Sequence, residues 1–225
     1  MQLHPHHPLG STNVFIDFSY ERGGVPSDEN LKFYFEPEIV YANDKLDTVI
    51  LKLKPDSKAY PPPLTKFHTF TQLTMDRCGY LIGHSRADIK KTDKYTFVRL
   101  NEQDIIDRQK WSIHNFQVDG YAGIEEPCRV LFNCSFEKGA SGAPGFLICP
   151  SDGQAYVELM LLCGYPTWYY DDNFKCKTVL ISNRHLVEQG VSMKSVYDAM
   201  NESDKSLCKA IFPSDDWDEE MAPME

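Results

Sequence analysis

Hydrophobic and polar residues alternate along most of this chain in short runs, and clusters of turn-forming residues separate one run from the next. Alternation with a period of two is typical of strands with one buried face, and many short strands indicate a sandwich or a barrel. We therefore predict an all-β fold. The expected strands cover residues 13–20, 31–41, 47–54, 79–84, 95–100, 129–134, 144–149, 155–164 and 177–182.

A helical pattern occurs only near the end of the chain. From about Ser182 to Met200, apolar residues recur in a broken amphipathic stripe that Gly190 interrupts. This stripe predicts a C-terminal helix over residues 184–203. The segment after it, 204–225, contains a run of acidic residues and is predicted to be a disordered tail.

One of the predicted strands begins with an acidic residue. Residues 46–53 read Leu-Asp-Thr-Val-Ile-Leu-Lys-Leu, and a period of two places Asp47 on the same face as Val49, Leu51 and Leu53. A carboxylate at the head of an apolar face needs a hydrogen-bond partner, because burying an unpaired charge is costly. Asp47 is therefore a candidate functional residue.

Residues 139–144 read Gly-Ala-Ser-Gly-Ala-Pro and lie between two apolar runs. A serine nucleophile needs such a tight turn, which exposes its hydroxyl and aims backbone N–H groups at the developing oxyanion. Glycine on both sides permits the turn. Such hexamers also occur as ordinary loops, since Gly, Ser and Pro are common turn residues. A phosphate-binding loop does not fit, because no Lys-Ser or Lys-Thr follows the second glycine.

Asp47 precedes Ser141 by 94 residues, which is close to the interval between the aspartate and the serine of a chymotrypsin-type triad. The α/β-hydrolases place the serine first, so the order disfavours that class. Few helical patterns lie between the two residues, which disfavours subtilisin-like enzymes as well. Order and spacing therefore favour a serine protease built from two β-barrels.

Composition excludes several other classes. A net charge of −10 repels phosphate backbones, and we see no basic patch that would form a direct nucleic-acid site. No apolar run approaches the roughly 18 residues of a membrane span, and the first residues lack the features of a secretory signal. The seven cysteines show no metal-ligand spacing. We expect an intracellular protein, nuclear or cytoplasmic, with reduced thiols, no metal and no cofactor.

Three consecutive prolines at 61–63 form a stiff connector and mark the expected boundary between two barrels. The predicted organisation is a disordered N-terminal segment over 1–12, a remnant of the first barrel over 13–60, a second barrel with the nucleophile loop over 61–183, and then the helix and the tail.

Four segments, taken together, are similar to a known protease family. They are the Leu-Asp sequence at 46–47 with its alternating strand, Tyr-Leu-Ile-Gly-His at 80–84, the turn at 139–144 and the Gly-x-Ser-Met sequence at 190–193. They resemble the trypsin-like domain of the intracellular proteases called "family with sequence similarity 111", over roughly residues 13–200. The resemblance implies a chymotrypsin-like double β-barrel and a serine endopeptidase that acts on protein or peptide substrates.

Members of that family are largely nuclear and are implicated in DNA replication, in the removal of protein–DNA crosslinks and in antiviral restriction. The trypsin-like template then gives roles to three residues of this chain. Ser141 would be the nucleophile, the N–H groups of Gly139 and Ser141 would form the oxyanion hole, and Asp47 would orient the imidazole of the general base.

The same template implies where the substrate pocket lies. Its base would come from a position about six residues before the nucleophile, which is Ser135, and its walls from the strand around Cys163 and Gly164. Ser135 carries no charge. This argues against a strict requirement for Arg or Lys as the P1 residue, on the acyl side of the scissile bond, and favours an aromatic or aliphatic one.

The triad histidine is not identifiable in the sequence. In the family it follows a Gly-rich strand, at a point that would lie upstream of the first residue here. His4, His6 and His7 precede Asp47 by intervals near that of the template, but neighbouring prolines remove the strand that would hold an imidazole. His84 follows Asp47 in order, and we expect it to be structural.

If the upstream segment is missing, only about three of the usual six strands of the first barrel remain, with unpaired edges. Two functions therefore stay open. One is a serine endopeptidase domain whose general base comes from upstream sequence or from the N-terminal histidines. The other is a catalytically silent protease-like module, a pseudoenzyme or truncated product, that binds a peptide or a protein partner.

Overall fold

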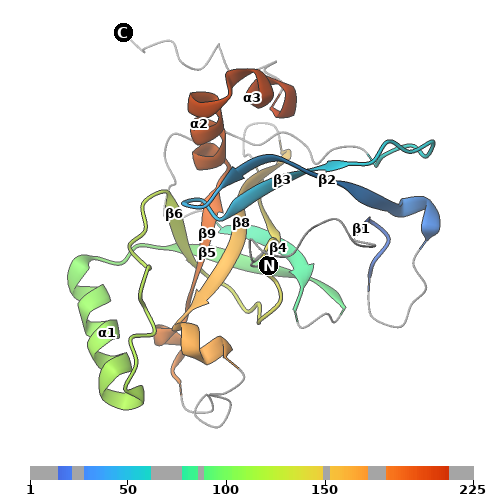
Figure 1. The fold of residues 1–225 in the computed structure, drawn as a ribbon. Helices are drawn as coiled ribbons and strands as arrows, with labels where there is room; N and C mark the ends of the chain where they lie inside the picture. Colours follow the sequence, from blue (N-terminus) through green and yellow to red (C-terminus); the bar gives the residue numbers. More distant parts are fainter. Residues whose placement is uncertain are drawn as a thin grey trace.

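A six-stranded barrel and a three-stranded sheet form the β-structure of the computed structural model, which describes residues 15–21, 28–61, 78–85, 89–148, 153–171 and 181–212 (Figure 1). The sheet contains β1 (Phe15–Asp17), β2 (Lys32–Asn43) and β3 (Thr48–Leu53). The barrel contains β4 (Cys78–His84), β5 (Lys90–Val98), β6 (Arg129–Asn133), β7 (Pro144–Ile148), β8 (Ala155–Tyr165) and β9 (Val187–Ser192). The helices are α1 (Glu102–Phe116), α2 (Met193–Ser203) and α3 (Lys205–Ile211), and 3-10 turns occur at Glu29–Leu31 (η1), Thr167–Tyr170 (η2) and Asn183–His185 (η4).

The predicted strands that fall within the described ranges are confirmed, with shifts at their ends. The largest shift is in β5, which begins at Lys90 rather than at residue 95, because its polar first half pairs with β4. Most of the predicted strand 177–182 lies outside the described residues, and so does the whole N-terminal segment 1–12.

The barrel closes in the order β4-β5-β6-β9-β8-β7, and β7 pairs back onto β4. Its neighbouring strands are all antiparallel. Alternate side chains point inward, as in β5, where Tyr95 and Phe97 are buried while Lys94 and Thr96 are exposed. The interior cluster that they join also contains Leu81, Phe132, Leu147 and Leu159.

The predicted helix over 184–203 is wrong in its first half, where the chain forms β9 instead. All six residues of β9 are buried, and the strand pairs with β6 and β8. A Cβ on Gly190 would lie 2.7 Å from the carbonyl oxygen of Met160, so the close approach of β8 requires glycine. A fully buried strand does not alternate, and its short run of residues cannot be told from a helix by periodicity alone.

The second half of that helix is confirmed as α2. Its N-terminus is capped by the Ser192 side chain, which accepts a hydrogen bond from the N–H of Ser195. The predicted disordered tail is wrong for residues 205–211, which form α3. Cys208 of α3 is buried in one cluster with Met200 of α2, so apolar packing holds a segment whose acidic surroundings indicated disorder. Residues 213–225 lie outside the described ranges.

Helix α1 lies between β5 and β6 and is absent from the sequence prediction. It begins with a capping box, in which the side chains of Asn101 and Asp104 each accept a hydrogen bond from the other's backbone N–H. Only Ile105 and Ser112 are buried in this helix. The Ser112 hydroxyl accepts a hydrogen bond from the Trp168 indole at 2.8 Å and donates to a backbone carbonyl. A helix held by polar contacts of this kind shows no hydrophobic stripe in the sequence. The Asn-x-x-Asp capping box at 101–104 is the one local pattern that indicates where this helix begins.

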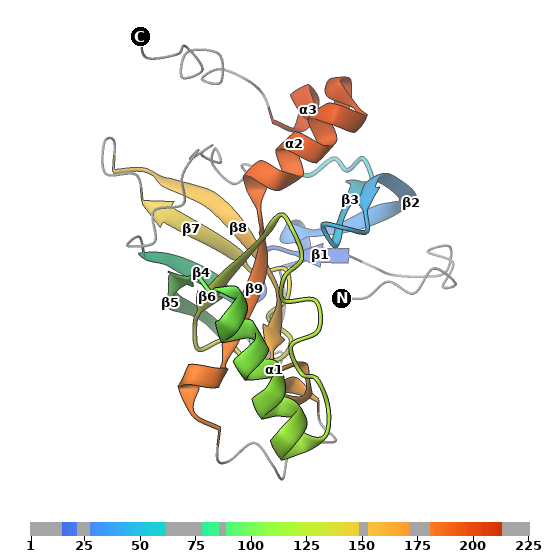
Figure 2. The ribbon, with the colours of Figure 1, turned by 90° about the vertical axis from the view of Figure 1, so that its left-hand side faces the viewer.

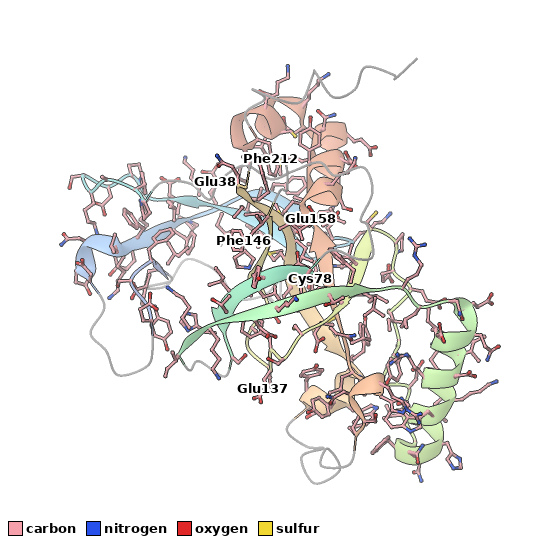
Figure 3. The ribbon with its side chains drawn as sticks, turned by 180° about the vertical axis from the view of Figure 1, so that it is seen from behind. Glu38, Cys78, Glu137, Phe146, Glu158 and Phe212 are labelled. Atoms are coloured by element: carbon pink, nitrogen blue, oxygen red, sulfur yellow. The ribbon has the colours of Figure 1, made fainter. Side chains whose placement is uncertain are left out.

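The sheet packs beside the barrel, next to the C-terminal helices (Figures 1 and 2). Leu46, in the turn between β2 and β3, is buried with Val191 of β9 and Met200 of α2. In the described residues the three strands predicted to belong to a first barrel form an open sheet, so the predicted double barrel is not observed there and the structure contains one closed barrel. Figure 3 shows the molecule from behind. Its labels identify Glu38 on the sheet, Phe146 and Glu158 on the barrel, and Phe212 after α3.

Among the helices of the described ranges, none combines the length and the apolar composition that crossing a membrane requires.

Candidate active site

Ser141 lies on a tight turn between β6 and β7. The glycines around it, Gly139 and Gly142, have φ angles of 92° and 90°, in the left-handed region that favours glycine. The turn is fixed from both sides, because the N–H of Gly142 donates to the carbonyl of Leu161 on β8 at 2.7 Å and the side chain of Ala140 is buried. Ser141 itself is exposed. The fold thus presents one hydroxyl on a constrained loop.

Two backbone donors flank this hydroxyl. In the part of the chain that the structure describes, no backbone carbonyl accepts a hydrogen bond from the N–H of Gly139 or from that of Ser141. The neighbouring amides are used, since Ala140 donates to Glu137 and Ala143 donates to Ala140. A turn with two unused donors next to a serine can bind an oxyanion.

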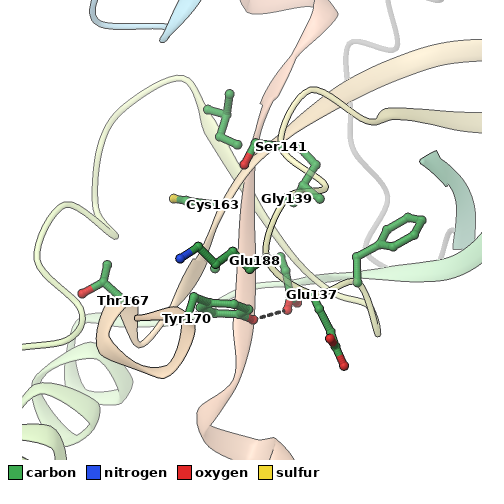
Figure 4. Close-up of a pocket in the computed structure, with 12 residues that line it drawn as sticks. Glu137, Gly139, Ser141, Cys163, Thr167, Tyr170 and Glu188 are labelled. Atoms are coloured by element: carbon green, nitrogen blue, oxygen red, sulfur yellow. Dashed lines mark hydrogen bonds between the residues drawn. The ribbon is translucent and has the colours of Figure 1, made fainter. Parts of the chain in front are cut away.

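A cavity of about 200 Å³ opens beside Ser141 (Figure 4). One wall is formed by residues 161–164 of β8, which include the predicted pocket residues Cys163 and Gly164, and another by the loop 136–139. Thr167, Tyr170 and Glu188 complete it. Because the lining is more apolar than polar, the cavity can receive a side chain with an apolar stem.

Ser135, the predicted base of the pocket, does not line this cavity. Its backbone N–H donates to the carboxylate of Asp93 on β5. Ser135 borders a separate cavity of about 240 Å³ together with Ser85 and Lys91. The structure therefore brings Cys163 and Gly164 to Ser141 and leaves Ser135 apart.

Glu188 is a residue of the cavity that the sequence pattern did not reveal. It lies on β9 and is buried, with 4% of its surface exposed. Its Oε1 accepts a hydrogen bond from the Tyr170 hydroxyl at 2.8 Å, and its Oε2 accepts one from the N–H of Cys134 at 3.2 Å. Burial raises the pKa of this carboxyl to about 7, although both hydrogen bonds act in the opposite direction.

The position of Tyr170 depends on a glycine. A Cβ on Gly164 would lie 2.3 Å from the Tyr170 ring, so any larger residue there would displace the ring from the cavity wall. The ring in turn holds the carboxylate of Glu188 (Figure 4). Gly164 and Glu188 could have been linked only by knowing that β8 and β9 are neighbours.

Asp47 lies in the turn that precedes β3, not on the strand. It is exposed and has a φ of 50°, and Leu46 takes the buried position beside it. The predicted apolar face is also wrong in part, because Val49 is exposed while Ile50 packs against the cluster below α2. The prediction fails because Asp47 belongs to the turn and not to the strand. In addition, the pairing of β2 with β3 contains register shifts that a strict period of two does not allow for.

The turn that carries Asp47 is fastened to the barrel by an arginine. Arg129 of β6 donates from Nη1 to the carbonyl of Leu46 at 3.0 Å and from Nη2 to that of Lys45 at 2.7 Å. Burial raises the pKa of the Cys163 thiol, and among smaller influences Arg129 lowers this pKa while Asp47 raises it.

No histidine of the described residues lines this cavity. His84 lies on β4 with its ring 4.7 Å from that of Tyr20, and His185 stacks on Trp111 at 3.7 Å. His4, His6 and His7 lie outside the described residues. Within the described ranges, no group of three His, Cys, Asp or Glu side chains gathers in the way that a metal site would need.

Comparison with known proteins gives a distant similarity to a serine protease. No family model matches the chain. It is 26% identical over 210 residues to the human protein named serine protease FAM111B, and the aligned part covers 87% of this chain. The chain spans 26% of the length of that protein. Together with the barrel, this similarity supports a distant relationship to trypsin-like serine proteases.

Proposed function

We propose that this chain is a trypsin-like serine endopeptidase domain that cleaves peptide bonds through an acyl-enzyme at Ser141. The observation that carries the proposal is the exposed hydroxyl on a glycine-constrained turn, with two unused N–H groups and a side-chain cavity next to it. A nucleophile, an oxyanion site and a substrate pocket in one place are the parts that acyl transfer needs. The substrate is a protein or a peptide, and we place the reaction inside the cell.

In this mechanism the Ser141 Oγ attacks the carbonyl carbon of the scissile bond and its proton passes to an imidazole. The N–H groups of Gly139 and Ser141 stabilise the negative oxygen of the tetrahedral intermediate. The C–N bond then breaks as the imidazole gives its proton to the leaving amine. A water molecule, activated by the same base, hydrolyses the ester and restores the serine.

Asp47 orients that imidazole and stabilises its charged form. Its location on a turn that Arg129 ties to β6, the strand that precedes the Ser141 turn, supports this role. Within this chain, the candidates for that imidazole are His4, His6 and His7, which lie outside the described residues.

A catalytically silent module that binds peptides is the second candidate. It is favoured by one observation, that no histidine among the described residues lines the cavity beside Ser141. Such a module would use the same cavity, or an open edge of the sheet, to hold an extended peptide without cleaving it.

A fluorophosphonate probe separates the two candidates. Such a probe phosphonylates an activated serine, so we expect it to label the wild-type chain and a Ser135→Ala variant, but not Ser141→Ala. Ser135 is the matched control because it lies in the same loop and is also exposed. Labelling is measured by intact-mass spectrometry, and circular dichroism checks that each variant is folded. A folded wild type that takes no label would contradict the peptidase proposal and favour the silent module.

A further inference from the structure

A single buried acid forms the far end of the cavity beside Ser141. Figure 4 shows Ser141 at one end and Glu188 with Tyr170 at the other. Glu188 is buried on β9 and borders the cavity, so its carboxylate faces whatever side chain enters. Leu161 and Leu162 also line the cavity.

We propose that Glu188 selects a basic P1 side chain, which enters the cavity and forms an ion pair with the carboxylate. This inference rests on the proposed function, because it names the substrate class of the same site. It reverses the preference for aromatic or aliphatic residues that the uncharged Ser135 predicts, since Ser135 does not border this cavity.

The hydrogen bonds of Glu188 leave room for a cation. Each carboxylate oxygen has two lone pairs and accepts one hydrogen bond here, from Tyr170 or from the N–H of Cys134. The Tyr170 hydroxyl donates its proton to Glu188, so the tyrosine oxygen can still accept a hydrogen bond. An ammonium group has three donors and can contact the carboxylate and the tyrosine oxygen together.

The charge of Glu188 is not neutralised by a neighbouring residue. In the described part of the chain, no Lys, Arg or His nitrogen lies within 4.0 Å of its oxygens. A buried carboxylate without a counter-ion is costly, and a cation from the substrate would lower that cost. The other two charged residues of the cavity, Glu137 and Lys138, are exposed and opposite in sign, so solvent screens them.

The apolar wall suits the stem of a basic side chain. Lysine and arginine bury their methylene groups along apolar surfaces while the charged end reaches a polar partner. Here the mostly apolar lining of the cavity offers the surface, and Glu188 the partner. A phenylalanine would cover the same wall but would leave the carboxylate desolvated and unpaired, which opposes binding.

The ion pair depends on pH. Burial raises the pKa of Glu188 to about 7. Hydrogen bonds from Tyr170 of η2, from the backbone N–H of Cys134 after β6 and from the backbone N–H of Glu188 itself lower this pKa, and the charge of Asp93 on β5 raises it. Since the free carboxyl loses its proton as the pH rises through about 7, the affinity for a cation rises over the same interval.

Binding of a small cation tests the inference without requiring catalysis. n-Butylammonium is titrated by NMR at pH 8 into the wild-type chain and into Ser141→Ala, with n-butanol as the neutral probe of similar shape. We expect both proteins to bind the cation with equal affinity and to bind it more tightly than butanol. Glu188→Gln should weaken binding of the cation by about tenfold or more. Glu137→Gln, at the exposed charge of the same cavity, should change it less than about twofold.

Two further measurements keep the result decisive. Tyr170→Phe changes the cavity wall but keeps the carboxylate, so we expect this variant still to bind the cation. If Tyr170→Phe binds and Glu188→Gln does not, the loss of binding is due to the lost charge and not to a collapsed cavity. Diphenyl phosphonate probes with lysine at P1 should label wild type faster than those with phenylalanine, and Glu188→Gln should reverse this order. Equal binding of butylammonium to wild type and Glu188→Gln would overturn the inference. Fluorophosphonate labelling of Ser141 in that case would leave the proposed function standing. Cation binding without labelling would leave a cation site at Glu188, but it would overturn the peptidase proposal and, with it, the role of that site in selecting a P1 side chain.

Discussion

Replacing Asp47 with asparagine is expected to slow acyl transfer at Ser141 by a factor of about 10⁴ when the imidazole is present. An amide at this position favours the wrong tautomer of the imidazole and cannot stabilise its charged form. The stability of the fold should hardly change, because Asp47 is exposed in a turn whose contacts to Arg129 come from the carbonyls of Lys45 and Leu46.

The rate of fluorophosphonate labelling measures this effect, and thermal unfolding checks the fold. Asp44→Asn is the matched control, since Asp44 belongs to the same turn and is also exposed. We expect Asp44→Asn to label at the wild-type rate. Equal rates for the two variants would mean that Asp47 takes no part in the reaction.

Truncating Leu159 to alanine is expected to give the largest loss of stability, about 2–5 kcal/mol in the free energy of unfolding. Leu159 is fully buried in the barrel cluster, and its Cδ1 lies 2.7 Å from where a Cβ on Gly145 would be, so it fills the space that this glycine leaves. The methyl groups lost from this position leave a cavity between β7, β8 and β9.

Urea denaturation measures that loss, with Ile148→Ala as the control. Ile148 is an aliphatic residue of the paired strand β7, but 55% of its surface is exposed, so its truncation should cost less than about 0.5 kcal/mol. Similar costs for the two variants would contradict the inward and outward alternation that defines the barrel.

The strand pattern of the barrel could be predicted from the sequence because its strands are half-buried. Tyr95 and Phe97 alternate with Lys94 and Thr96, and this period of two is visible without coordinates. Strand β9 has no such alternation, since both of its faces are covered. The sequence pattern therefore assigns its residues, wrongly, to the helix that follows.

The helices show two other limits. Helix α1 is held by the hydrogen bonds of Ser112 and by its cap. The spacing of its apolar residues therefore says little about where the helix forms. Helix α3 is stabilised by Cys208 against α2, and the acidic run that follows at 215–220 concealed this contact between neighbouring helices.

The candidate site was accessible to sequence reasoning where local geometry decides it. Two glycines around Ser141 specify the turn, and the positive φ angles of Gly139 and Gly142 are the reason. Residues that reach the cavity from distant strands were not accessible. Glu188 and Tyr170 meet only because β8 and β9 are paired, and Arg129 reaches Leu46 across 83 positions of sequence.

A crystal structure of the fluorophosphonate-labelled chain tests the central claim most directly. We predict phosphorus bonded to Ser141 Oγ, a phosphoryl oxygen about 3 Å from the N–H groups of Gly139 and Ser141, and the carboxylate of Asp47 on the same side of the adduct. An adduct on another residue, or a phosphoryl oxygen turned away from both N–H groups with Asp47 on the opposite face, would contradict the account.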